Sequence, residues 1–84
     1  MIEMINYDAL YTLIGSNFRR IRMKKIGLTQ EKLAEELNLS RSFISHIESQ
    51  KVNNGVSLDT LFLISQKYNI DIRDFFQGYE QFLK

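Results

Sequence analysis

Two short amphipathic segments with three residues between them constrain the fold of this chain most. Residues 30–37 and 41–49 both carry apolar side chains at the three- and four-residue spacings of an α-helix. Thr29 and Ser40 precede them and can cap their N-termini, because a side-chain oxygen there accepts an otherwise unpaired backbone N–H. Asn38 tolerates the left-handed backbone that ends a helix. The pattern therefore predicts two helices joined by a short turn.

The inward-facing side chains of these segments predict how the two helices pack. Ala34 is small, and we expect the helices to cross close to it, because a larger side chain would push them apart. Leu39 is expected to fill the turn. The full set of inward positions is Leu33, Ala34, Leu37, Leu39, Ile44 and Ile47. The outward positions of the second helix are short or polar: Arg41, Ser42, Ser45, His46 and Ser49.

The segment before this pair shows the same helical periodicity, and the chain contains no proline. A first helix is expected from about residue 8 to residue 25, capped by Asp8 and ended by Gly27. Its inward stripe would be Leu10, Ile14, Phe18 and Ile21. Gly15 lies inside this segment and weakens a helix, so the helix could instead start near Ile14 and leave a separate arm before it.

Two further helical segments are expected in the second half of the chain. Ser57 can cap a helix over residues 58–68, and Asn69 can end it. The inward stripe of this helix would be Leu58, Leu61, Ile64 and Tyr68. Asp71 can cap a last helical segment from residue 72 to at least residue 76, and Gly78 leaves open whether it continues to residue 84.

These elements predict an all-α fold, a compact bundle of about five helices. Its 84 residues are expected to form one domain. Within it, residues 1–13 would be an N-terminal arm or helix extension, 14–76 the core and 77–84 a C-terminal tail. Residues 52–56 contain an Asn-Gly pair that could signal a hairpin, but they are interpreted as a loop, since neither flank alternates like a strand.

Composition limits the chemistry that the chain can perform. It has no Cys and a single His, His46, so we expect neither disulfides nor a metal site. The same residues leave no set of groups for acid–base or nucleophilic catalysis, so we expect no enzyme activity and no cofactor. No secretory signal is evident, and the longest aliphatic-aromatic run, residues 61–64, is far too short for a bilayer. We expect a cytoplasmic protein without membrane contacts.

The net charge of +1 hides an uneven distribution. Residues 14–51 carry eight Lys/Arg and four Asp/Glu, which gives +4, whereas residues 1–13 give −2 and residues 52–84 give −1. A basic cluster lies at the end of the first expected helix: Arg19, Arg20, Arg22, Lys24 and Lys25. Such a cluster is most often a solvated helix face, so by itself it only permits an anionic partner.

Around the two short helical segments, the sequence resembles the phage repressor and Cro family of helix-turn-helix proteins, also called the Xre family. Three stretches carry the resemblance: GLTQEKLA at 27–34, LSRSFISHIE at 39–48 and SLDTL at 57–61. It covers roughly residues 14–76, and it is specific because the alanine, the caps, the turn and the apolar spacing agree across three helices. Asn38 stands where the family usually has Gly, and the stretch between Arg22 and Gln30 is one residue longer than usual. The resemblance implies a lambda-repressor-like bundle with the helix-turn-helix at its second and third helices.

The resemblance also implies which residues would contact duplex DNA. The third helix would place four residues in the major groove: Arg41, Ser42, Ser45 and His46. Arg41 would be the bidentate partner of a guanine. Phosphate contacts would come from Gln30, Ser40, Lys51, Asn53 and Asn54. The alternative for the four groove residues is that they form an ordinary exposed helix face. The alternative for the residues of the following loop is that they are merely solvated.

Glu48 has a different expected role, because an unneutralised carboxylate beside a DNA-reading helix would repel phosphate. The resemblance implies a structural ion pair between Glu48 and an arginine of the first helix, Arg22 or Arg19.

Members of the family usually act as symmetric dimers, since one short helix reads too few base pairs. The expected dimer interface is Leu63, Phe76, Tyr79, Phe82 and Leu83, because these apolar residues exceed what a small core can bury. The alternative is that they complete the core, which we favour for Phe75. The N-terminal arm is a second candidate interface through Ile2, Ile5, Tyr7 and Tyr11.

The function implied is a sequence-specific transcriptional regulator that binds double-stranded DNA, a repressor acting as a homodimer on a two-fold symmetric operator. Within this class the short chain is similar to restriction-modification controller proteins and to small phage or plasmid repressors. The alternative is an antitoxin, which binds a toxin protein as well as its own promoter.

Overall fold

The computed structural model of the chain describes residues 7–49 and 56–83. These residues contain helices and no strand, which confirms the predicted all-α fold. The α-helices are α1 (Tyr7–Arg20), α2 (Gln30–Leu37), α3 (Arg41–Ser49) and α4 (Leu58–Tyr68). A π-helical turn, η1 (Ile21–Ile26), continues α1, and two 3-10 helices follow α4: η2 (Ile72–Phe76) and η3 (Tyr79–Phe82). None of the helices in the described ranges is long and apolar enough to cross a membrane.

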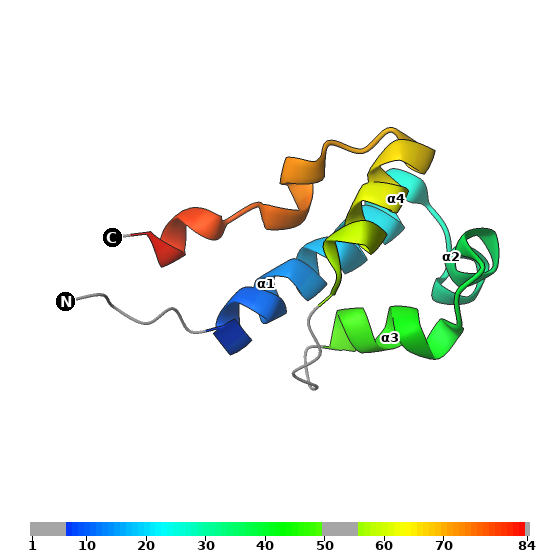
Figure 1. Ribbon diagram of the computed structural model, residues 1–84, viewed down its shortest axis with the longest axis horizontal. Coiled ribbons are helices and arrows are strands. Elements are labelled where there is room, and N and C mark those ends of the chain that lie inside the picture. Colours follow the sequence, from blue (N-terminus) through cyan, green and yellow to red (C-terminus); the bar gives the residue numbers. More distant parts are fainter. Residues whose placement is uncertain (1–6, 50–55, 84) are drawn as a thin grey trace.

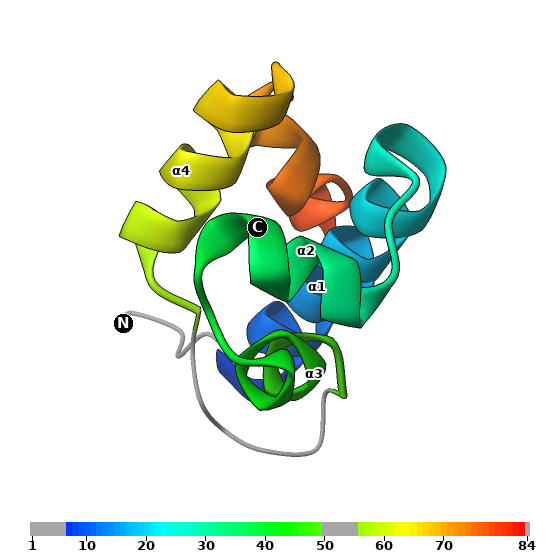
Figure 2. The same cartoon turned by 90° about the vertical axis from the view of Figure 1, so that its right-hand side faces the viewer.

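The helix α1 lies in the middle of the molecule, with the other elements packed around it (Figure 1). In this view α3 lies below α1 and α2 lies to the right of it, packed on α3, while α4 and η2 lie toward the upper side. The 3-10 helices then run back along α1. Figure 2 confirms from a second direction that α3 and η2 occupy opposite sides of α1. One face of α3 is therefore left uncovered at the edge of the molecule.

The core lies where α1 and η1 meet the other helices. Its buried apolar residues are Phe18, Ile21, Leu33, Ala34, Leu37, Ile44, Ile47, Leu61, Ile64 and Phe75. The rings of Phe18 and Phe75 lie 6.0 Å apart between their centroids, so η2 closes the core from the side opposite α3. Ala34 is buried between α2 and α3 as predicted, and Leu39 packs against the core from the turn. The apolar positions of both helices thus face inward as expected.

The caps expected around α2 and α3 are present. Thr29 Oγ1 accepts the backbone N–H of Lys32 (3.0 Å), and Ser40 Oγ accepts that of Phe43 (3.1 Å). Asn38 adopts the left-handed backbone conformation, with φ of 58°. Because these contacts are local, the sequence predicts the bounds of both helices and the three-residue turn correctly.

The first expected helix is formed by α1 together with η1, and its last six residues are not α-helical. The backbone N–H of Gly27 donates to the carbonyl of Arg22 (2.7 Å), five residues back, which is the bonding pattern of a π-helix. Gly27 ends the turn with φ of 78°, a conformation that costs glycine little. A π-turn holds one residue more than an α-turn over the same span, which accounts for the additional residue between Arg22 and Gln30.

The start of α1 settles the choice left open by Gly15. The helix begins at Tyr7 and includes Gly15, which is buried, so Asp8 lies in its first turn and its expected role as the N-cap is wrong. Residues 7–13 therefore extend the helix rather than form a separate arm. Ile14 lies in the buried stripe as expected, while Leu10 is half-buried.

Helix α4 has the expected bounds but not the whole of its expected inward stripe. Ser57 Oγ accepts the backbone N–H of Thr60 (3.3 Å), so the predicted cap is present. Leu61 and Ile64 are buried, but Leu58 is 59% exposed, so its assignment to the core is wrong. Leu58 is the first residue of the helix, and Thr60 in the same turn is buried instead.

The C-terminal segment is fastened to α1 by polar side chains. Asn17 is buried, and its Nδ2 donates to the carbonyl oxygens of Phe75 (3.0 Å) and Gln77 (2.9 Å). Arg20 donates to the carbonyl of Asp74 (3.2 Å), and Lys25 forms an ion pair with the carboxylate of the same residue. These bonds satisfy backbone carbonyls that lie outside regular α-helix, and they hold η2 on α1.

Candidate nucleic-acid interface

Helix α3 has two chemically distinct faces. Its inner face is buried through Ile44, Ile47 and Glu48. The four residues expected to read bases lie on the other side, where Arg41, Ser42 and His46 are exposed and Ser45 is half-buried. The structure brings these four residues together on one helix at the edge of the molecule. The residues of this face are polar, and Ser42 and Ser45 are short, so a flat or grooved partner could approach the helix closely.

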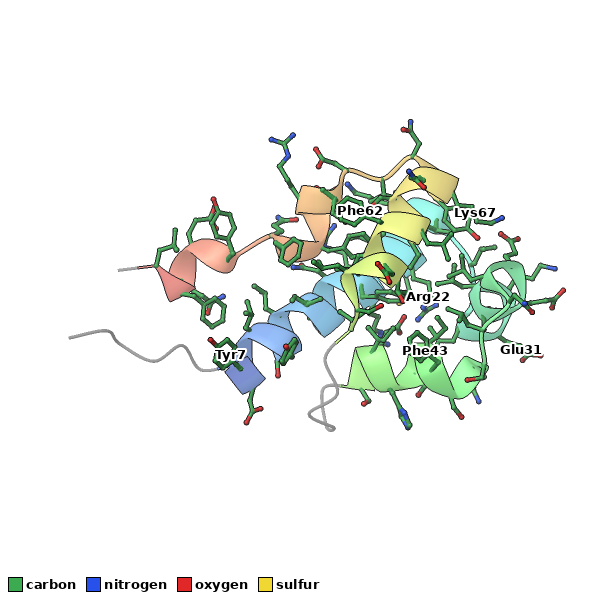
Figure 3. All side chains as sticks on the ribbon, in the orientation of Figure 1. Tyr7, Arg22, Glu31, Phe43, Phe62 and Lys67 are labelled. Carbon is green, nitrogen blue, oxygen red and sulfur yellow. The ribbon has the colours of Figure 1, made fainter. Side chains whose placement is uncertain are left out.

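The expected pairing partner of Glu48 is Arg22 and not Arg19, which is exposed. Arg22 Nε lies 2.6 Å from Glu48 Oε2, and Arg22 Nη2 lies 3.0 Å from Oε1. Both residues are buried, with exposed fractions of 8% for Arg22 and 6% for Glu48. Figure 3 shows the side chain of Arg22 directed into the interior, toward α2 and α3. The pair therefore ties α3 to η1 through two charge-assisted hydrogen bonds.

Two further contacts extend this pair into a network. Arg22 Nη1 donates to the carbonyl of Leu28 (2.8 Å), which fixes the loop before α2. Gln30 Nε2 donates to Glu48 Oε1 (3.0 Å), which joins the first residue of α2 to α3. The network spans η1, the loop, α2 and α3, and it holds the two helices of the helix-turn-helix at a fixed angle. We name the set Arg22, Gln30 and Glu48 the buried polar network.

The contact between Gln30 and Glu48 is one that sequence reasoning missed. The two residues are 18 positions apart, and Gln30 was expected only to face a phosphate. Its side chain is half-buried, so it remains partly accessible at the N-terminus of α2. No local pattern in the sequence signals this bond, because it depends on how α2 and α3 cross.

The basic cluster at the end of α1 divides into paired and exposed members. Arg22 lies in the buried polar network, Lys25 pairs with Asp74, and Arg20 donates to the backbone of the C-terminal segment. Arg19 and Lys24 are exposed. Much of the positive charge that the sequence concentrates here therefore serves contacts within the chain.

The remaining site predictions fall partly outside the described residues. Lys51, Asn53 and Asn54 lie in the range 50–55, which the structure does not describe. Ser40 is exposed beside α3, where its hydroxyl oxygen caps the helix.

The residues expected at a dimer interface lie at the surface to different degrees. Leu63, Tyr79 and Leu83 are exposed, whereas Phe76 and Phe82 are half-buried. Phe75 belongs to the core, as favoured from the sequence. Phe62, labelled on α4 in Figure 3, is also exposed and immediately precedes Leu63 in the chain. Tyr7 and Tyr11 of the second candidate interface are exposed, while Ile2 and Ile5 lie outside the described residues.

The groups that would support other chemistry are few in the described part of the chain. No cluster of three His, Cys, Asp or Glu residues is placed to hold a metal ion in residues 7–49 and 56–83. The one strongly shifted tyrosine is structural: burial, followed by a hydrogen bond to Glu36, raises the pKa of Tyr68 to about 12. This contact ties the last turn of α4 to α2.

Comparison with known proteins supports the arrangement of these helices. A family described as helix-turn-helix matches residues 18–75, which include α2, α3 and α4. The chain is 42% identical over 62 residues to Control protein C.BamHI of Bacillus amyloliquefaciens, a match covering 74% of each chain. It is 34% identical over 67 residues to Control protein C.MunI of a Mycoplasma species, covering 80% of this chain and 88% of that one.

A third relative shares only part of its length with this chain. The HTH-type transcriptional regulator PrpR of Mycobacterium tuberculosis is 30% identical over 64 residues, which is 76% of this chain and 13% of the relative. No solved structure matches the chain.

Proposed function

Because this chain belongs to the Xre-type helix-turn-helix family of DNA-binding transcriptional regulators, we propose that it reads a specific operator with the outer face of α3. The observation that carries the proposal is the uncovered polar face of α3, held in place from behind by the buried polar network. A helix that is anchored on one face and polar on the other fits the major groove, which is wide enough to admit it.

Each proposed contact has a distinct chemical role. Arg41 lies at the start of α3, where its guanidinium can donate two parallel hydrogen bonds to a guanine. Ser42, Ser45 and His46 follow along the same face and offer shorter donors and acceptors. Phosphate contacts are proposed for Gln30, Ser40, Lys51, Asn53 and Asn54, which would fix the position of α3 along the groove.

We further propose that the protein acts as a homodimer on a two-fold symmetric operator and represses transcription there. A single α3 spans nine residues and reads few base pairs, so two copies would be needed for useful discrimination. The exposed apolar residues Leu63, Tyr79 and Leu83, together with the half-buried Phe76 and Phe82, form the proposed interface. Occupation of a promoter-overlapping operator by such a dimer would block transcription.

The proposal is tested with an operator selected from a pool of random DNA duplexes. Arg41→Ala should weaken binding to this operator by about 1 to 3 kcal/mol and relax the preference at one base pair in each half-site. Lys67→Ala is the control for loss of a positive charge, because Lys67 is an exposed cation in the last turn of α4, outside both the α3 face and the proposed dimer interface. The measurement is the dissociation constant of both variants on operators with single base-pair changes.

Two results would count against this assignment. If Arg41→Ala weakens all duplexes equally, the guanidinium contacts the backbone instead of a base. If selection yields no preferred sequence at all, the chain is not a sequence-specific regulator. Stable copurification with a small protein encoded beside it would favour the antitoxin alternative.

A further inference from the structure

The amide of Gln30 is held by a group that can only accept hydrogen bonds. Gln30 Nε2 lies 3.0 Å from Glu48 Oε1, and Glu48 is 6% exposed. The same carboxylate accepts two hydrogen bonds from Arg22, at 2.6 Å and 3.0 Å. Glu48 is thereby anchored independently of Gln30, so it provides a fixed acceptor for the amide.

A fixed acceptor determines which end of a glutamine amide faces the protein. The amide carries an acceptor oxygen at one end and an NH2 group with two donors at the other. A carboxylate repels the oxygen and attracts the NH2 group, so Gln30 is held with its nitrogen toward Glu48. One N–H is used by Glu48, and the second is available to another acceptor.

The surroundings of Gln30 favour a negatively charged second acceptor. Gln30 is the first residue of α2, and the backbone N–H groups of Lys32 and Leu33 donate to the N-cap Thr29, to its side-chain oxygen and its carbonyl oxygen respectively. The earlier N–H groups of the helix, at Gln30 and Glu31, therefore point out of its N-terminus, where the helix dipole attracts anions. The side chain is only half-buried, so an anion can reach its amide.

We propose that Glu48 is a positioning residue for DNA binding, because it orients the Gln30 amide so that one NH2 group bridges the buried carboxylate and a DNA phosphate. Arg22 neutralises the carboxylate, which allows Glu48 to lie close to the phosphate without repelling it. The amide is oriented before DNA arrives, so binding loses less side-chain entropy. This inference rests on the proposed function, because it requires α3 to enter the major groove of duplex DNA.

The first test compares side-chain motion in the free, unmodified protein. Nitrogen-15 relaxation of glutamine side-chain amides by NMR should show Gln30 as rigid as the helix backbone. Gln66 is the internal control, since it is an exposed glutamine on α4 and should show the averaged motion of a free side chain. A Gln30 amide as mobile as that of Gln66 would overturn the proposal, and no variant needs to fold for this measurement.

The second test replaces single operator phosphates with uncharged methylphosphonates. One replacement should weaken the unmodified protein about tenfold or more, but should leave Gln30→Ala unaffected, which identifies the phosphate bound by Gln30. The double variant Arg22→Met/Glu48→Leu removes the acceptor without leaving a buried charge. It should lose most of the tenfold effect at that phosphate and keep the effects at all other phosphates. Gln66→Ala should behave as the unmodified protein does.

The outcomes separate this inference from the proposed function. If the double variant keeps the full effect at the Gln30 phosphate, Glu48 has only a structural role and the inference is wrong. If every methylphosphonate replacement weakens Gln30→Ala as much as it weakens the unmodified protein, Gln30 contacts no phosphate. The inference then fails, although the proposed operator binding is unaffected. Failure of the unmodified protein to select any operator would instead overturn the proposed function itself.

Discussion

Breaking the Arg22–Glu48 ion pair from one side should destabilise the fold far more than removing both partners. In Arg22→Met, the carboxylate of Glu48 stays buried but accepts one hydrogen bond, from Gln30, where it accepted three before. In Glu48→Leu, the guanidinium of Arg22 stays buried and keeps the carbonyl of Leu28. Leaving one charge of a buried pair without its partner costs about 3 to 5 kcal/mol.

The magnitude is large for a chain of this size. A domain of 84 residues has a free energy of unfolding of about 4 to 13 kcal/mol, so each single variant should lose a large part of its stability. The double variant Arg22→Met/Glu48→Leu has no unpaired charge and buries two apolar side chains of similar length. Its main cost is the lost hydrogen bond to the carbonyl of Leu28, about 1 to 3 kcal/mol. It should therefore be more stable than either single variant.

The assay is urea unfolding followed by circular dichroism at one fixed protein concentration, because a dimer would make stability depend on concentration. The two single losses should sum to about 6 to 10 kcal/mol, well above the loss in the double variant. If the double variant loses as much as the sum, Arg22 and Glu48 act through other contacts, and the ion pair does not couple α3 to η1.

Three further predictions follow from the packing and the caps. Ala34→Leu should lower the free energy of unfolding by about 1 to 3 kcal/mol, because the larger side chain overpacks the contact of α2 with α3. Glu35→Leu, on the exposed face of α2, should not lower it. Equal urea midpoints for the two variants would show that the helices do not cross at Ala34. Deleting residues 77–84 should yield monomers that bind the operator more weakly. Tyr79→Glu should have the same effect, although it changes only one exposed side chain. If sedimentation shows an unchanged dimer, the dimer interface lies elsewhere. The hydrogen bond from the Arg73 side chain lowers the pKa of Asp71 from its usual 3.8 to about 2. The ionised Asp71 carboxylate therefore stabilises the folded protein fully above pH 3.8, and this stabilisation is lost as the pH falls through about 2. The difference in Tm between the wild type and Asp71→Asn should therefore shrink from about pH 5 to about pH 2, and a constant difference would contradict it.

The parts of the fold that depend on neighbouring residues were predicted well. Thr29, Asn38 and Ser40 mark the bounds of α2 and α3 because a cap is a contact within three residues. The outer face of α3 follows from the same logic, since residues buried at helical spacing leave the opposite face exposed.

The parts that depend on how the helices dock were not predictable from local pattern. Leu58 belongs to an apolar stripe in sequence, but it is exposed as the first residue of α4 while Thr60 in the same turn is buried, and the orientation of the helix on the core is set by the packing of the whole helix. The bond between Gln30 and Glu48 and the ion pair between Lys25 and Asp74 join residues 18 and 49 positions apart. Such contacts require the tertiary arrangement, and the basic cluster therefore gave little indication of which of its members would be paired.

The π-helical turn η1 gives this region of the chain a tolerance to changes in length. The turn closes from Gly27 to the carbonyl of Arg22, and its extra residue lies among the exposed positions Met23, Lys24 and Lys25. Deleting one of these three would let the turn rewind as an ordinary α-helix, while the residues that anchor its two ends stay where they are. A single-residue deletion here would thus be absorbed within one turn, and the spacing between α1 and the pair α2 and α3 would not change.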